Sequence, residues 1–264
     1  MGIIQWGTDP WGQNVPLHAA WYLIWVALAV GLIGLGLHAA WVHFHPESGG
    51  VPPLSPDETA CVPEEVKRHS LAARLFHWIM AATMLVLLGT AFLPKVGLRF
   101  AWVDLHWMAG VVLILAIAFH IVHAVLGMDF RSIWPGPSDL KELRGEPVRT
   151  GKYPLGNKMY HLALVFFGLC MALTGLLLLA KVRTPFFERD PYILGDAAWG
   201  VVYLLHGLAG IGLIALVIIH IYFALRPEKL PITRAMVVGS MKRGYYLEHH
   251  DPALWGCKQP SRRT

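Results

Sequence analysis

Long apolar stretches alternate with shorter polar segments along this chain. The hydrocarbon core of a bilayer is about 30 Å thick, and a helix needs about 20 mostly apolar residues to cross it. Five stretches reach this length, and they cover residues 19–41, 71–93, 101–128, 160–180 and 200–225. The pattern therefore predicts an all-α fold, an integral membrane bundle of five transmembrane helices.

The polar segments separate the first helix from the other four. Residues 43–63 contain several prolines, glycines and acidic residues, a composition that favours an irregular linker. We therefore predict three parts: an N-terminal transmembrane helix with its linker over residues 1–66, a four-helix core over residues 67–250, and a cytoplasmic tail over residues 251–264.

Composition agrees with a membrane protein, because the chain is 55% hydrophobic and only 15% charged. Its net charge of +5 would suggest a nucleic-acid partner in a soluble protein, but here the distribution of charge matters more. If the helices alternate in direction, 17 of the 22 Lys and Arg residues lie on one side and 5 on the other. Positive residues are enriched in cytoplasmic loops, so we expect the N-terminus outside, the C-terminus in the cytoplasm, and no nucleic-acid partner.

The three cysteines, Cys61, Cys170 and Cys257, lie far apart in the sequence. No CxxC or CxxCH spacing occurs, so neither a cysteine-rich zinc site nor a covalently attached c-type haem is indicated. We expect three isolated thiols.

Two segments of the chain resemble each other. Residues 105–110 and 205–210 both read Leu-His-x-x-Ala-Gly, and each histidine is followed fourteen residues later by another, His120 or His220. Fourteen helical steps return the side chain to within about 40° of the same face and separate the histidines by about 21 Å. The glycine one turn after each first histidine leaves room for a flat macrocycle. The two segments therefore look like two copies of one histidine-containing motif.

The depths of the intramembrane histidines sort them into pairs. In the predicted topology, His77 starts the second helix in the cytoplasmic leaflet, where His220 ends the fifth. His106 starts the third helix in the outer leaflet, where His206 starts the fifth. Neutral imidazole is a strong ligand for haem iron, so each pair predicts a bis-histidine haem in the bundle core. Spacing alone also allows His120 to replace His77.

Two other interpretations of these histidines remain open. A histidine-lined metal or proton transporter would also place imidazoles in the membrane, where ionisable groups usually mark a functional site. It does not explain why the histidines sort into two leaflets, and the sequence lacks evident discontinuous helices or paired intramembrane carboxylates. A purely structural anchor is the third interpretation, and an optical spectrum of the protein distinguishes all three.

Several ordered motifs resemble a known family. They are Arg74-Leu75-Phe76-His77-Trp78, Leu105-His106, the stretch from Gly151 to Met159 that reads GKYPLGNKM, Leu205-His206, and Ile219-His220-Ile221-Tyr222. Together they resemble the cytochrome b (gamma) subunit of respiratory formate dehydrogenases, over about residues 67–250. The resemblance implies a multi-pass subunit of a bacterial or archaeal cytoplasmic membrane that transfers electrons and does no substrate chemistry itself.

The same resemblance implies cofactors and partners. Two b-type haems would be ligated by His77 with His220 and by His106 with His206. An iron–sulfur subunit and a molybdenum- or tungsten-containing catalytic subunit would lie on the outer face. Menaquinone or ubiquinone would exchange electrons beside the cytoplasmic haem.

The expected quinone pocket includes Gly156, whose backbone N–H lies close to the ring, and Asn157 or Lys158 as side-chain donors. An equally open interpretation is that Gly156 and Asn157 only shape and cap the helix start. The sequence departs from the formate dehydrogenase pattern at Pro154 and Asn157. The first helix and the preceding Ile4-Gln5-Trp6-Gly7 are similar to the cytochrome b subunits of thiosulfate or polysulfide reductases, and nickel–iron hydrogenase subunits share the four-histidine arrangement.

Overall fold

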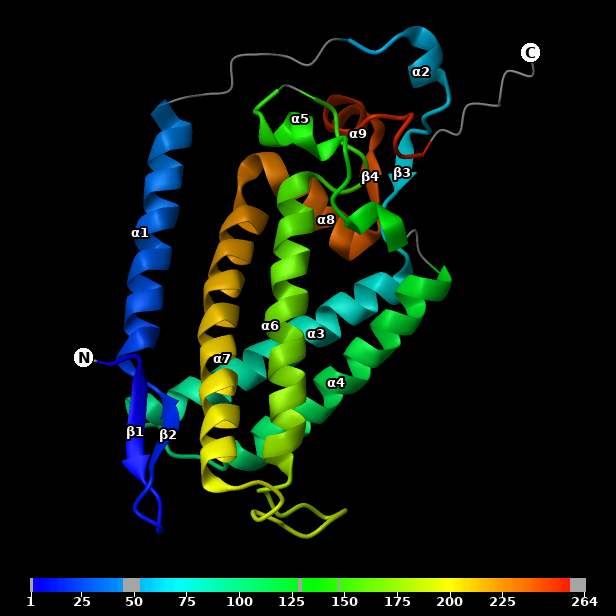
Figure 1. Cartoon of the computed structure of the whole chain (residues 1–264). Helices are drawn as coiled ribbons and strands as arrows, with labels where there is room; N and C mark the ends of the chain where they lie inside the picture. Colours follow the sequence, from blue (N-terminus) through cyan, green and yellow to red (C-terminus); the bar gives the residue numbers. More distant parts are fainter. Residues whose placement is uncertain (1, 45–52, 128–129, 147, 257–264) are drawn as a thin grey trace. The chain divides into compact units, whose positions relative to one another are not determined.

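The computed structural model describes residues 2–44, 53–127, 130–146 and 148–256. Within these ranges, five helices are long and apolar enough to cross a membrane (Figure 1). They are α1 (Tyr22–Phe44), α3 (Leu71–Phe92), α4 (Trp102–Gly127), α6 (Leu155–Leu179) and α7 (Asp196–Leu225). The short helix η1 (Leu93–Val96) extends α3. The predicted all-α membrane bundle is therefore confirmed.

Three helices begin at other residues than the apolar pattern predicts. Helix α6 starts at Leu155 instead of residue 160, because the Glu142 carboxylate accepts a hydrogen bond from the Leu155 N–H at 2.8 Å. Such a side chain satisfies one of the free N–H groups of a first helical turn. Helix α7 starts four residues early, at Asp196. Helix α1 starts late, at Tyr22, because the preceding residues form a strand.

An N-terminal β-hairpin precedes α1 and was not predicted. Strands β1 (Ile4–Thr8) and β2 (Asn14–Ala19) pair antiparallel, with a register shift between Gln5 and Trp6. The hairpin packs on the first turns of α7, where a Cβ added to Gly200 would lie 1.7 Å from the Pro16 carbonyl oxygen. Only a glycine permits this approach of two backbones.

The chain divides into two compact units. The first comprises residues 1–39, 79–117 and 163–220, and the second comprises residues 40–78, 118–162 and 221–264. The core of the first unit joins α3, α4 and α7 through four buried apolar residues: Met84, Leu87, Leu113 and Leu213. Helix α6 packs against this core through Phe167 and two neighbours, Leu164 and Met171.

The second unit contains most of the short elements. They are α2 (Pro56–Ala60), β3 (Glu65–Lys67), η2 (Phe130–Ile133), α5 (Asp139–Leu143), η3 (Pro227–Lys229), α8 (Leu230–Val238), β4 (Ser240–Lys242) and α9 (Arg243–His249). Strands β3 and β4 pair antiparallel and tie the segment before α3 to the segment after α7. Their facing residues Val66 and Met241 join Ala235 and Tyr246 in a small buried cluster.

A buried ion pair holds α5 to the first turn of α6. The Lys158 ammonium donates to both carboxylate oxygens of Asp139 at 2.9 Å, and both side chains are about nine-tenths buried. The same carboxylate accepts a hydrogen bond from the Gly136 N–H at 2.6 Å. Buried charges need such partners. Lys158 is therefore engaged with Asp139, which differs from its predicted role as a donor to quinone.

A buried hydrogen-bond network lies between the end of β3 and the end of α9. The Arg68 guanidinium donates to Nε2 of His250 at 3.3 Å, and Nδ1 of His250 donates to the Gly151 carbonyl at 2.8 Å. Because a carbonyl only accepts and a guanidinium only donates, this chain fixes the proton of His250 on Nδ1. Both side chains are almost fully buried. Arg68 also lies against the rings of Tyr153 and Trp255.

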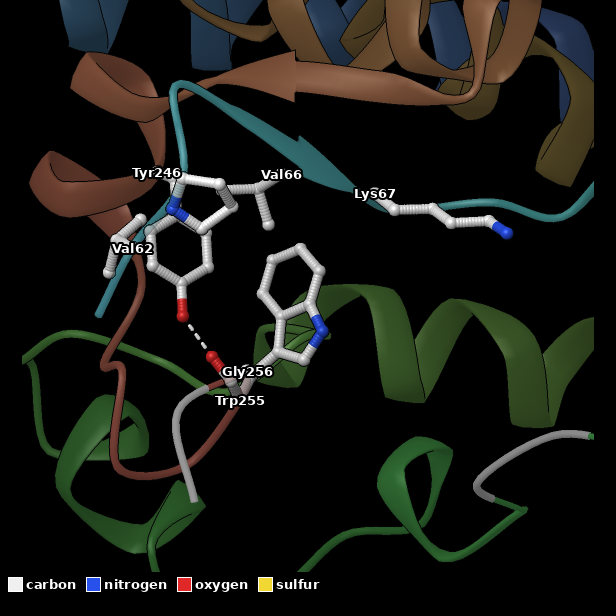
Figure 2. Close-up of a pocket in the computed structure, with 7 residues that line it drawn as sticks. Val62, Val66, Lys67, Tyr246, Trp255 and Gly256 are labelled. Atoms are coloured by element: carbon white, nitrogen blue, oxygen red, sulfur yellow. Dashed lines mark hydrogen bonds between the residues drawn. The ribbon is translucent and has the colours of Figure 1, made fainter. Parts of the chain in front are cut away.

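A cavity of about 200 Å³ lies beside this network (Figure 2). Apolar side chains, among them Val62, Val66 and Trp255, form most of its wall, and the Tyr246 hydroxyl donates to the Trp255 carbonyl at one edge. None of the histidines predicted as ligands lines this cavity.

The cysteines differ in state. Cys170, in α6, is a free thiol, as expected. Cys61 forms a disulfide bond, so the prediction of three isolated thiols is wrong for this residue. Cys257 lies outside the residues that the structure describes.

Because His250 is buried in its neutral form, we predict that acid destabilises the protein. Burial and then the nearby Arg68 charge lower the pKa of His250 from 6.5 to about 4. Between these pH values the unfolded chain binds a proton that the folded chain does not, so the free energy of unfolding falls as pH drops from 6.5 to 4. Burial first, and then the Arg68 charge, lowers the pKa of His69 to about 3. Acidification below pH 6.5 therefore lowers the free energy of unfolding through His69 as well.

Thermal unfolding in detergent between pH 4 and pH 8 measures this dependence. The variant His250→Asn keeps a donor near the Gly151 carbonyl but does not titrate. We expect it to be less stable than the wild type at pH 8 and to lose less stability on acidification. Equal slopes for the two proteins would contradict the assignment.

The close approach at Gly200 gives a second prediction. Gly200→Ala forces the hairpin away from α7, and we expect it to lower stability by about 1–3 kcal/mol, the usual range for overpacking. Gly168→Ala in α6 is the matched control, because a Cβ there meets nothing within 4 Å and alanine favours a helix. Thermal unfolding and proteolysis of the hairpin measure both changes, and a Gly200→Ala protein as stable as the control would refute the packing.

Candidate functional site

The first unit brings together two of the predicted histidines. His106 lies near the start of α4, and His206 lies in the first half of α7. The centroids of the two rings are 6.3 Å apart, with 66° between the ring planes. Both side chains are partly buried. The paired Leu-His-x-x-Ala-Gly segments thus converge at one place.

A threonine from a neighbouring helix fixes each ring. Thr90 of α3 lies 2.8 Å from Nδ1 of His106, and Thr174 of α6 lies 2.8 Å from Nδ1 of His206. Each threonine hydroxyl also donates to a carbonyl oxygen of its own helix, that of Val86 at 2.8 Å for Thr90. The Thr174 hydroxyl donates to the Cys170 carbonyl at 2.6 Å.

These hydrogen bonds define the protonation of both rings. The threonine proton is given to a helix carbonyl, which only accepts, so the hydroxyl oxygen accepts the Nδ1–H of the imidazole. The other nitrogen, Nε2, then carries a free lone pair. A ligand histidine whose second nitrogen donates to a fixed partner is oriented and made more basic toward a metal. His106 and His206 are therefore prepared as metal ligands.

The separation of the rings suits one metal ion between them. Two metal–imidazole bonds of about 2 Å placed end to end, together with the distance from each nitrogen to its ring centre, add to about 6 Å. The observed centroid distance is 6.3 Å. His106 and His206 would hold a single metal ion at this separation, as the iron of a haem requires.

Open space lies beside Thr90 and at Gly210. A groove of about 340 Å³ runs along α3, and it is lined by Gly89, Thr90, Leu93 and other apolar residues. A Cβ added to Gly210, one turn beyond His206, would meet nothing within 4 Å although the residue is buried. Open space is therefore present at Gly210, and the room for a macrocycle that the glycine pattern predicts stays a prediction.

Sequence reasoning missed the two threonines. Each is a polar residue in an apolar stretch of its helix, and each adjoins a glycine, as Gly89-Thr90 and as Thr174-Gly175. That recurring pair was the available signal. Gly175 is also close to the site, since a Cβ there would lie 3.5 Å from Cε1 of His206.

The other predicted site residues lie elsewhere. His77 is in the part of α3 that belongs to the second unit, whereas His220 ends the first unit in α7. Their pairing remains a prediction. Gly156 and Asn157 are exposed in the first turn of α6, and a Cβ on Gly156 would meet nothing within 4 Å. The His120 ring stacks on Phe76 of α3 at a centroid distance of 4.1 Å.

Comparison with known proteins agrees with this site. The sequence model of the prokaryotic cytochrome b561 family matches residues 68–239, which is more than half of the chain and includes all four predicted ligands. No curated protein matches the chain. With five apolar helices and a histidine pair suited to iron, the chain belongs to the prokaryotic cytochrome b561 family of membrane proteins that hold haem b and transfer electrons.

Proposed function

We propose that this protein is the membrane subunit of an oxidoreductase and passes electrons between a peripheral partner and membrane quinone, with two b-type haems. The observation that carries the proposal is the outer pair, His106 and His206, with both Nδ1 atoms held by threonines. Haem b, when bound, supplies one-electron redox chemistry. His106 and His206 would hold the iron, and Thr90 and Thr174 would orient their rings.

For the second haem we propose His77 and His220 as ligands. Their predicted depth in the cytoplasmic leaflet and the motif resemblance support this pair. The alternative ligand His120 is less suited, because its ring stacks on Phe76 with only 9° between the planes and its Nδ1 has no partner to orient it. Two haems, one near each leaflet, would shorten each electron-transfer distance through the low-dielectric layer.

The resemblance supports a formate dehydrogenase-like partner. We propose an iron–sulfur subunit and a molybdenum- or tungsten-containing catalytic subunit on the outer face, because the chain itself has no iron–sulfur cysteine cluster. The extra helix α1 and the hairpin before it favour a second candidate, the cytochrome b subunit of a thiosulfate or polysulfide reductase. Electrons would then flow from quinone toward the partner.

We place the quinone, menaquinone or ubiquinone, at the cytoplasmic start of α6. The exposed Gly156 and Asn157 support this position, since a quinone needs open apolar space with a few polar groups for its carbonyl oxygens. The cytoplasmic membrane of a bacterium or archaeon is the setting that such a subunit requires.

The proposed orientation, with the N-terminus outside and the C-terminus in the cytoplasm, rests on the distribution of Lys and Arg residues. We expect a periplasmic reporter to be active when fused before α1 and inactive when fused after α9. A cytoplasmic reporter should show the reverse. An N-terminus in the cytoplasm would invert or break the proposed pairing by depth.

The outer site predicts a graded response to substitution. His206→Ala should remove one haem, seen as loss of about half the α-band absorbance of the reduced protein, and spare most of the other. Thr174→Val removes the hydrogen bond to Nδ1, so we expect haem to be retained with about 10-fold to 100-fold weaker affinity, the usual effect of losing such a support.

Thr174→Ser is the matched control, because serine keeps the hydroxyl and should bind haem as the wild type does. Haem content per chain after dialysis against a haem-binding competitor measures the difference. A purified wild type with no haem spectrum would refute the proposed function. Equal haem retention in Thr174→Val and Thr174→Ser would refute the role of the threonine.

A further inference from the structure

The β-hairpin before α1 lies outside the residues that the family model matches, and no cofactor ligand comes from it. It belongs to the first unit, as do most of α1 and the start of α7. Only Ala20 and Trp21 separate β2 from α1. The Ala20 N–H donates to the Ile3 carbonyl at 2.9 Å and so holds the hairpin against the start of α1. An apolar helix long enough to span a membrane therefore fixes the position of the hairpin.

Contacts between β2 and α7 define the depth of the hairpin. A Cβ added to Gly207 would lie 3.5 Å from the Cβ of Ala19, and Gly200 contacts Pro16 three residues earlier in β2. The seven helical steps from Gly200 to Gly207 cover about 10 Å. The polar headgroup layer on each side of a bilayer is about 5–8 Å thick. The contact between β2 and α7 thus extends over about the thickness of this layer.

Two contacts between a lysine and a tryptophan lie at the two ends of this stretch. The Lys95 ammonium is 3.8 Å from the ring centroid of Trp21, at the end of the hairpin next to α1. The Lys181 ammonium is 4.7 Å from the ring of Trp199, which directly precedes Gly200. Tryptophan gathers at membrane–water boundaries, and lysine extends its charge toward the headgroups. Both contacts therefore place the hairpin at the membrane boundary.

The side chains of the hairpin follow the polarity of such a boundary. Ile3, beside the start of α1, is 60% exposed. Trp6, which pairs with Pro16, is 54% exposed. Asp9, in the turn, is the only Asp, Glu, Lys or Arg among residues 2–44. From α1 outward the order is thus apolar, aromatic and charged, which is the order from hydrocarbon through headgroups to water.

The turn of the hairpin satisfies its own backbone donors. The Asp9 N–H donates to the Gln13 carbonyl at 2.9 Å, and the Gly12 N–H donates to the Asp9 carbonyl at 3.0 Å. The Asp9 carboxylate accepts from the N–H groups of Trp11 and Gln13 at 2.9 and 2.7 Å. Pro10 has no N–H. A turn with its donors paired in this way can enter a layer that contains little free water.

We propose that the hairpin of residues 3–19 is an interfacial anchor that binds the lipid headgroup layer on the side of the membrane where α1 begins. Ile3 faces the acyl chains, Trp6 lies among the headgroups, and the turn with Asp9 faces water. The partner is the lipid surface and not a second protein, because α1 and α7 of the same chain hold the hairpin at this depth. The proposal goes beyond the proposed function and holds for either orientation of the chain.

Photo-crosslinking in native membranes tests the partner. The photoreactive amino acid p-benzoylphenylalanine is introduced in place of Ile3, Trp6 or Trp11, and the adducts are identified by mass after irradiation and purification. We expect lipid adducts at Ile3 and Trp6 and fewer at Trp11, which lies in the turn. The matched control is Leu254, which is 55% exposed and follows α9, and we expect no lipid adduct there.

Each other outcome of this experiment overturns the proposal. Adducts with a second polypeptide at Ile3 and Trp6 would make the hairpin a protein interface. The absence of any adduct at these two positions would place the hairpin in water.

A pair of charge substitutions tests the anchoring itself. Trp6→Glu places a carboxylate in the headgroup layer, whereas Trp11→Glu places it in the turn. In lipid nanodiscs we expect the amide hydrogens of β1 to exchange about threefold to tenfold faster in Trp6→Glu and within about twofold of the wild type in Trp11→Glu. Both variants should keep the haem spectrum of the wild type. Equal exchange of β1 in Trp6→Glu and the wild type would also overturn the proposal.

Discussion

The hydrogen bond between a histidine Nδ1–H and a threonine hydroxyl is the interaction on which the outer site depends. A polar ring in hydrocarbon is costly unless its hydrogen-bonding groups have partners. Thr90 and Thr174 supply that partner at 2.8 Å from two different helices, and each passes its own proton to a helix carbonyl. Because the proton is fixed on one nitrogen, the other is free for iron.

The same constraint explains how the rest of the molecule treats polar groups. Lys158 and Asp139 lie together in a buried ion pair that secures the start of α6. Arg68 and His250 form a chain that ends on a backbone carbonyl. Small residues then allow close packing elsewhere, most clearly at Gly200, where α7 meets the hairpin.

The neighbours of each histidine decide how its ring is held. The outer pair has a hydroxyl at Nδ1 and presents lone pairs 6.3 Å apart by ring centroids, which suits a metal. The ring of His120 has no hydrogen-bond partner at Nδ1 among the described residues, and it stacks on Phe76 instead.

The sequence alone predicted the five apolar helices and singled out His106 and His206, because helix length and the Leu-His-x-x-Ala-Gly motif are local properties of the chain. The partners of those rings were decided by tertiary structure, since Thr90 is 16 residues from His106 and Thr174 is 32 from His206. The hairpin before α1 also depends on a distant surface. No local pattern states which hydroxyl faces which ring, and therefore which nitrogen carries the proton.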